Sequence, residues 1–164
     1  MKKTLFLCLT MAIAMMIMPS CKKAEKQIIG KWKITHAKTE GYTDQYAVGE
    51  TWTFKEGGKF IGYLDFGKKK GNSKDSEIEC NWRINGDELV LEGGDLDYSE
   101  SGYDYYGDYY SYKENIVFTF DIEQLDKSNL VVSGKMKEDW SETEDGETYH
   151  GTGSYKTEYE LEAK

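Results

Sequence analysis

The stretch that decides the fold is EIECNWRINGDELVLE, residues 77–92. In its first half every second residue is apolar: Ile78, Cys80, Trp82 and Ile84. This period of two is typical of a β-strand that buries one face. Asn85-Gly86-Asp87 follows, and Asn and Gly accept the positive φ of a tight turn at little steric cost. Leu89 to Leu91 then predict a second short strand, so the stretch predicts an antiparallel hairpin with one apolar face.

The same alternation recurs on both sides of this hairpin. Strands are predicted around Trp32–Ile34, Trp52–Phe54, 59–66, Ile116–Ile122, Leu130–Val132 and Tyr155–Leu161, separated by turns rich in Gly, Asp and Asn. The total is about eight strands. Short-linked antiparallel strands of this kind close into an up-and-down barrel or fold as a two-sheet sandwich. The alternation does not choose between them, because both bury one face of every strand.

The first predicted strand opens with IIGKWKI at 28–34. Gly30 and Trp32 resemble the Gly-x-Trp signature of lipocalins, in which the tryptophan closes the barrel floor. Together with ETWTFKEGGKFIG, CNWRINGDELVLEG and FTFDIEQLDKSNLVVSGK, this stretch resembles the small lipocalin-like domains of bacterial lipoproteins over residues 28–163. The resemblance implies an all-β, about eight-stranded antiparallel up-and-down lipocalin-like barrel.

The amino terminus has the layout of a secretory signal. Lys2 and Lys3 precede an apolar run from Leu5 to Met18, which is shorter than the roughly 20 residues that span a bilayer. The run ends in Met18-Pro19-Ser20-Cys21, which resembles the cleavage and lipidation box of bacterial lipoproteins and implies lipidation of Cys21. We therefore expect a signal peptide over 1–20, a lipidated tether over 21–27 and the barrel domain over 28–164.

The net charge and the expected lipid anchor limit the classes of partner. Removing Lys2 and Lys3 from the 21 basic residues leaves 19 against 30 acidic, a formal charge of −11. This balance argues against nucleic acid as a partner. Acyl chains on Cys21 would attach the protein to its membrane. Lys22 and Lys23 follow without the aspartate that favours inner-membrane retention, so we expect the outer membrane, on its periplasmic side.

The inward face of the predicted barrel is rich in aromatic residues. The candidate ligand-cavity residues are Trp52, Phe54, Cys80, Trp82, Phe118, Phe120, Tyr155 and Tyr159. Two alternatives remain open: these side chains fill the barrel at the density of a native interior, or they line a cavity for one small ligand. Cys80 is expected to act as a small apolar residue.

A Tyr/Asp-rich insert, DLDYSESGYDYYGDYYSY at 95–112, separates two predicted strands. Its tyrosines Tyr98, Tyr103, Tyr105, Tyr106, Tyr109 and Tyr110 suggest a contact surface for a glycan or a protein, since tyrosine offers contact area and a hydroxyl at low entropy cost. Calcium binding by its acidic residues is an alternative, although the spacing fails the EF-hand pattern. A third interpretation is that the insert forms a solvated lid or an extended hairpin between two barrel strands.

Known catalytic motifs are missing from the sequence. It contains no serine nucleophile elbow, Walker loop or His-Glu-x-x-His, so we expect no catalytic residue, no metal site and no cofactor. We expect a non-enzymatic envelope lipoprotein that binds a small apolar or carbohydrate-like ligand. The alternative is a filled-core module that meets an envelope protein through its acidic, tyrosine-rich loop.

Overall fold

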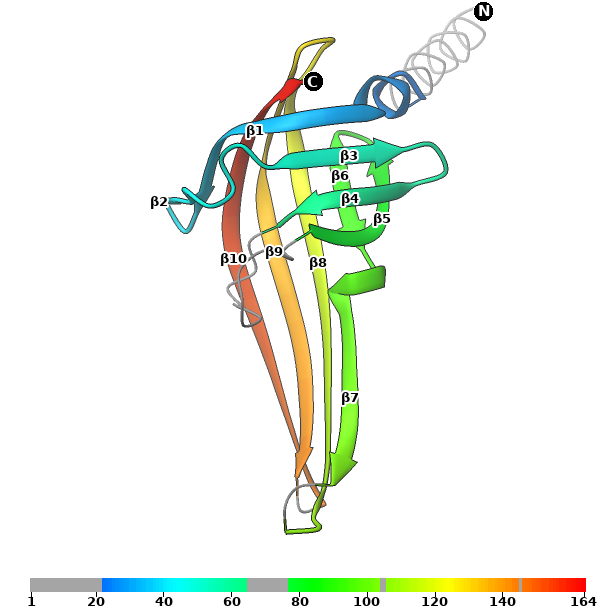
Figure 1. The fold of residues 1–164 in the computed structure, drawn as a ribbon, viewed down its shortest axis with the longest axis vertical. Helices are drawn as coiled ribbons and strands as arrows, with labels where there is room; N and C mark the ends of the chain where they lie inside the picture. The colour runs from blue at the N-terminus through cyan, green and yellow to red at the C-terminus, as the bar shows by residue number, and fades with distance from the viewer. Residues whose placement is uncertain (1–21, 65–76, 104–105, 145) are drawn as a thin grey trace, which may run out of the picture.

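The computed structural model describes residues 22–64, 77–103, 106–144 and 146–164, and the upper part of Figure 1 shows a closed antiparallel barrel. The barrel strands are β1 (Gly30–Thr39), β3 (Thr51–Lys55), β4 (Lys59–Tyr63), β5 (Glu77–Asn85), β6 (Glu88–Glu92), β8 (Tyr109–Leu125), β9 (Asn129–Glu144) and β10 (Glu147–Ala163). Each pairs with the next, and β10 returns to pair with β1. This confirms the eight-stranded up-and-down barrel and excludes the sandwich.

The interior of the barrel is packed with aromatic rings. Trp52 is fully buried at the centre, with the ring centroids of Tyr159, Phe60 and Phe120 at 4.7, 5.4 and 5.9 Å. Phe54 lies between the rings of Phe60 and Trp82, at 5.2 and 5.6 Å. Offset and edge-to-face pairs of this kind add to the stabilisation from apolar burial.

A β-bulge in β1 changes which residues face the core. The register against β10 shifts between Ile34 and His36, so one extra residue interrupts the period of two. Trp32, Ile34 and then Ala37 are buried, whereas His36 is only partly covered. Unbroken alternation from Trp32 and Ile34 would place His36 on the buried face; that inference is wrong here, because local alternation does not reveal a bulge.

Residues 22–28, which include most of the segment expected to be the tether, form a short helix. Ile28, at its end, is fully buried, and its carbonyl accepts a hydrogen bond of 2.7 Å from the Trp32 indole Nε1–H. Gly30 between them has φ 143°, in the region that favours glycine. The Trp32 indole therefore ties the end of this helix to the first strand. Within the described part of the chain, no helix has the length and apolarity to cross a bilayer. Cys21 and the predicted signal peptide lie outside the described residues.

Three barrel strands, β8, β9 and β10, continue well beyond the barrel and form a second structural unit with one further strand, β7 (Asp97–Tyr103) (Figure 1). The one-turn 3-10 helix η1 (Gly94–Leu96) leads from β6 to β7, which pairs along 109–115 of β8. On the other side β9 and β10 pair without interruption to Glu144 and Glu147. We call this four-stranded region, residues 97–103, 109–115, 138–144 and 147–153, the extended sheet. The two-residue strand β2 (Tyr42–Thr43) pairs with β1.

Candidate functional site

The structure places most of the predicted cavity residues inside the barrel. Trp52, Phe54, Cys80, Trp82, Phe118, Phe120 and Tyr159 are all buried, with at most 8% of any of them exposed. Their rings occupy the space between the strands by packing on one another. The barrel therefore has the features of the filled core that the sequence left as one of its two alternatives.

Tyr155 is the exception to the predicted inward set. It lies on the same face of β10 as Thr157 and Tyr159, yet it is 42% exposed. Pairing of β10 with β1 ends at Thr157 and Thr39, so Tyr155 stands just outside the barrel, where this strand enters the extended sheet. Alternation predicted its face correctly but did not reveal where the barrel ends.

Cys80 is a buried thiol in this arrangement. Its side chain lies in β5 opposite Phe60, and desolvation by burial, with a further contribution from the nearby Asp95 carboxylate, raises the pKa of the thiol to about 12. Only the thiolate is a strong nucleophile or metal ligand. Cys80 therefore acts as an apolar residue, as the sequence suggested.

The strand register divides the extended sheet into two chemically different faces, because residues directly opposite each other in antiparallel strands share a face. Three rows on one face read Tyr98–Glu114–Trp140–Gly151, Glu100–Tyr112–Glu142–Tyr149 and Gly102–Tyr110–Glu144–Glu147. We call these twelve positions the aromatic–glutamate face. It holds five aromatic residues, five glutamates and two glycines, and it contains no Lys, Arg or His.

The aromatic–glutamate face is continuous with the inner surface of the barrel. Glu114, Ile116 and Phe118 alternate along β8 on one side of the strand, and all three are buried. The face therefore begins where the packed core ends and runs outward from it. Its exposed positions are Glu100, Glu142, Glu144, Glu147 and Tyr149, while Tyr98, Tyr110, Tyr112 and Trp140 are partly covered.

Two aromatic rings on this face lie across glycines of the edge strands. A Cβ built on Gly151 would stand 2.4 Å from Cε2 and Cζ2 of Trp140, and a Cβ on Gly102 would stand 3.3 Å from the Tyr110 ring. Each ring therefore extends sideways over a neighbouring strand and covers backbone that has no side chain. Cover of strand glycines by cross-strand aromatics is a known stabilising device in sheets. It also spreads the ring surface over a wide area.

Tyrosine hydroxyls fix some of the carboxylates on the face. Tyr98 donates a hydrogen bond to the Glu100 carboxylate, and Tyr149 donates one of 2.8 Å to Glu147. The rings of Tyr98 and Tyr112 pack at 6.0 Å between centroids. The acidic groups are thus held beside aromatic rings.

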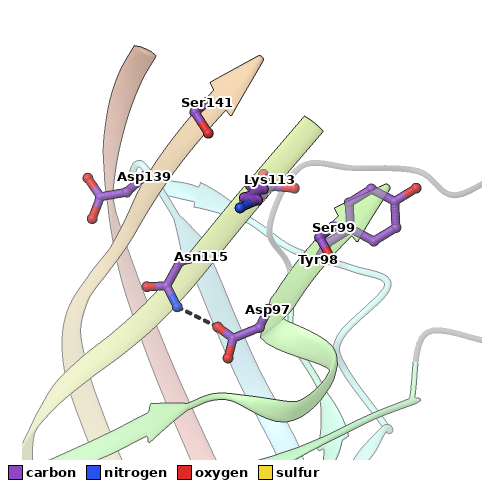
Figure 2. A pocket seen from close by; sticks show the side chains of 8 residues that line it. Asp97, Tyr98, Ser99, Lys113, Asn115, Asp139 and Ser141 are labelled. Atoms are coloured by element: carbon purple, nitrogen blue, oxygen red, sulfur yellow. Dashed lines mark hydrogen bonds between the residues drawn. The ribbon is translucent and has the colours of Figure 1, made fainter. Parts of the chain in front are cut away.

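The opposite face of the extended sheet carries mainly small polar residues. Its three rows read Asp97–Asn115–Asp139–Thr152, Ser99–Lys113–Ser141–His150 and Ser101–Ser111–Thr143–Thr148, and we call it the hydroxyl face. A shallow depression of about 340 Å³ lies here, lined chiefly by Asp97, Ser99, Lys113, Asn115, Asp139 and Ser141 (Figure 2). The Asn115 amide donates a hydrogen bond to Asp97 across it.

The predicted contact tyrosines separate between the two faces. Tyr98 and Tyr110 belong to the aromatic–glutamate face, whereas Tyr103 and Tyr109 pack on each other at 5.7 Å on the other side. Tyr106 is exposed in the connecting turn, and Tyr105 lies outside the described residues. Trp140, Glu142, Glu144 and Tyr149 of this face are not among the contact residues predicted from the sequence. Along 138–150 aromatic and acidic residues alternate with Ser and Thr, and this alternation indicates a strand with two different faces.

The acidic residues considered for calcium are dispersed. The Asp95 carboxylate accepts the Glu79 backbone N–H at 2.7 Å, Asp97 lies on the hydroxyl face, and Glu100 lies on the other face. Among the residues that the structure describes, no three His, Cys, Asp or Glu side chains form a group able to hold a metal ion.

No protein-family model matches the chain, and no curated protein matches it. Two solved structures resemble it in fold. A short afifavidin–biotin complex gives a TM-score of 0.40 at 10% identity, covering 84% of this chain and 96% of that one. A rhizavidin–biotin complex gives a TM-score of 0.35 at 9% identity, covering 79% and 90%.

Proposed function

We propose that this chain is a lipid-anchored, non-enzymatic binding protein of the bacterial envelope, and that it binds its partner on the extended sheet. The barrel serves as the rigid support. The observation that carries the proposal is the contrast between the two parts of one continuous surface. Inside the barrel, aromatic rings pack against Trp52 and are buried. Beyond the barrel, aromatic rings and carboxylates face outward.

Anchoring follows from the amino terminus. Acyl chains on Cys21 would hold the protein at the membrane, and we assign it to the outer membrane facing the periplasm, in the manner of the lipocalin-like lipoproteins that its sequence resembles. In cells, Cys21→Ser should move the protein from the membrane fraction to the soluble fraction. Retention of this variant in the membrane would contradict the anchor.

Site-specific photo-crosslinking in the lipidated protein tests where the partner binds. Tyr149 and Thr148 are neighbours in β10 with side chains on opposite faces, and both are exposed. A crosslinking residue at 149 should capture a partner in the native envelope, and one at 148 should not. Equal capture at both positions, or a small molecule that copurifies inside the barrel, would overturn the proposal.

A further inference from the structure

The aromatic–glutamate face concentrates negative charge. Five of its twelve positions are glutamates and none is a cation. Glu144 of β9 and Glu147 of β10 are direct cross-strand neighbours, and like charges in that position destabilise a sheet. A face built for solubility alone would intersperse both signs. This face instead concentrates repulsion at the exposed end of the extended sheet.

The arrangement of the rings points to a cationic partner. Along and across the strands every glutamate has an aromatic neighbour: Glu114 lies between Tyr98 and Trp140, and Glu142 lies between Tyr112 and Tyr149. An ammonium or guanidinium group gains from the face of an aromatic ring and from an adjacent carboxylate at once. A neutral sugar would stack on the rings and donate hydroxyl hydrogen bonds to the carboxylates, but it brings no positive charge.

The spacing matches an extended polypeptide. Successive rows on one face of a strand are about 7 Å apart, because each residue advances roughly 3.3 Å. Side chains at alternate positions of an extended peptide have the same spacing. A peptide lying along β9 would therefore place a basic side chain near each row in turn, at Trp140, Glu142 and Glu144.

We propose that the aromatic–glutamate face binds an extended, basic polypeptide segment that presents Lys or Arg at alternate positions. This inference rests on the proposed function and specifies its ligand class. Cations pair with Glu142, Glu144 and Glu147, and their aliphatic stems lie on Trp140 and Tyr149. Binding relieves the repulsion between Glu144 and Glu147 and weakens as salt rises, because exposed charges are screened.

The test uses the mature protein without its acyl chains and an eight-residue peptide of alternating Lys and Ser, measured by calorimetry at two salt concentrations. The matched peptide alternates Glu and Ser. The Lys–Ser peptide should bind, and more weakly at high salt, while the Glu–Ser peptide should not. Equal binding of both peptides, or binding that is insensitive to salt, would overturn the inference.

Two variants locate the site. Glu142→Gln/Glu144→Gln should weaken binding about three- to tenfold, the loss expected for two exposed ion pairs. Glu160→Gln/Glu162→Gln makes the same charge change at exposed positions of β10 on the barrel and should leave binding unchanged. Trp140→Leu keeps an apolar cover on Gly151 but removes the ring face, and should weaken binding about two- to fivefold. Equal losses in both double variants would show general charge attraction and overturn the site.

The same titration separates this inference from the proposed function. A neutral oligosaccharide of six glucose units serves as the second probe. If it binds and Trp140→Leu abolishes that binding while the Lys–Ser peptide fails, the ligand class is wrong and the extended sheet remains the binding surface. If neither probe binds and crosslinking at 149 also fails, the proposed function fails with it.

Discussion

The indole of Trp140 in β9 lies over Gly151 in β10, so close that a Cβ at position 151 would stand 2.4 Å from two of its ring carbons. The glycine therefore sets how low the ring sits on the sheet. Substituting this residue is a way to move one aromatic ring of the aromatic–glutamate face without touching the ring itself.

Gly151→Ala should lift the Trp140 indole from the sheet and expose it to water. Subtracting the fluorescence spectrum of a Trp140→Phe variant leaves the emission of Trp140 without that of the three barrel tryptophans. In Gly151→Ala this emission should shift to the red. Thr152→Ala, on the hydroxyl face next to it, should not change this emission. An unchanged spectrum for Gly151→Ala would mean that the ring does not rest on the glycine.

Phe120→Ala tests whether the barrel is filled. Phe120 is fully buried against Trp52 and Tyr159, so the substitution should lower the free energy of unfolding by about 3–5 kcal/mol, measured by urea denaturation. The new apolar cavity should bind benzene, as dry engineered cavities do, whereas the unsubstituted protein should not. Benzene binding of equal strength by the unsubstituted protein would show a pre-existing cavity.

Cys80 should resist alkylation in the folded protein. With the pKa of its thiol raised to about 12 by burial, very little thiolate exists at pH 8. In a Cys21→Ser background, iodoacetamide should label Cys80 only after denaturation. Ser141→Cys in a Cys80→Ser background provides an accessible control that should be labelled under native conditions. Rapid native labelling of Cys80 would contradict its burial.

Asp126 should make stability depend on acid pH. Its carboxylate accepts hydrogen bonds from the Ser128 backbone N–H, the Gln124 amide and the Asn129 backbone N–H, which lower its pKa to about 2. A depressed pKa stabilises the fold above the unfolded value of roughly 4, and this stabilisation is lost as pH falls toward 2. Asp126→Asn should lower the urea midpoint at pH 7, and the difference should shrink between pH 4 and pH 2.

A variant that removes only one of the hydrogen bonds to the Asp126 carboxylate provides the control. Gln124→Ala removes one of the donors to Asp126 and should give a smaller difference of the same sign. A difference between Asp126→Asn and the unsubstituted protein that stays constant down to pH 2 would contradict the role of the charged carboxylate.

The barrel was predictable because its pattern is local. The buried face of β5 can be predicted from its own alternation, without reference to any other strand. The structure buries all four apolar residues of that alternation, Ile78, Cys80, Trp82 and Ile84. His36 and Ala37 show the limit of this approach. A bulge inserts one residue into the alternation, and its position depends on the pairing with β10.

The aromatic–glutamate face was not predictable in the same way. Tyr98, Tyr112 and Trp140 come from three strands, and only the register between those strands places them on one face. In the sequence the two acidic segments, at 95–112 and from Glu138, are separate. They lie side by side because β8 pairs with β9, and the local alternation of residues does not reveal that pairing.

The central claim, that binding takes place on the extended sheet and leaves the barrel untouched, is tested most directly by the indole N–H signals in a ¹⁵N NMR titration with the Lys–Ser peptide. The chain has four tryptophans. Those of the barrel, Trp32, Trp52 and Trp82, donate to the carbonyls of Ile28, Tyr63 and Lys55, and their signals should stay in place. The Trp140 signal alone should move. Movement of the Trp52 or Trp82 signal with Trp140 unchanged would place the ligand inside the barrel and contradict the account.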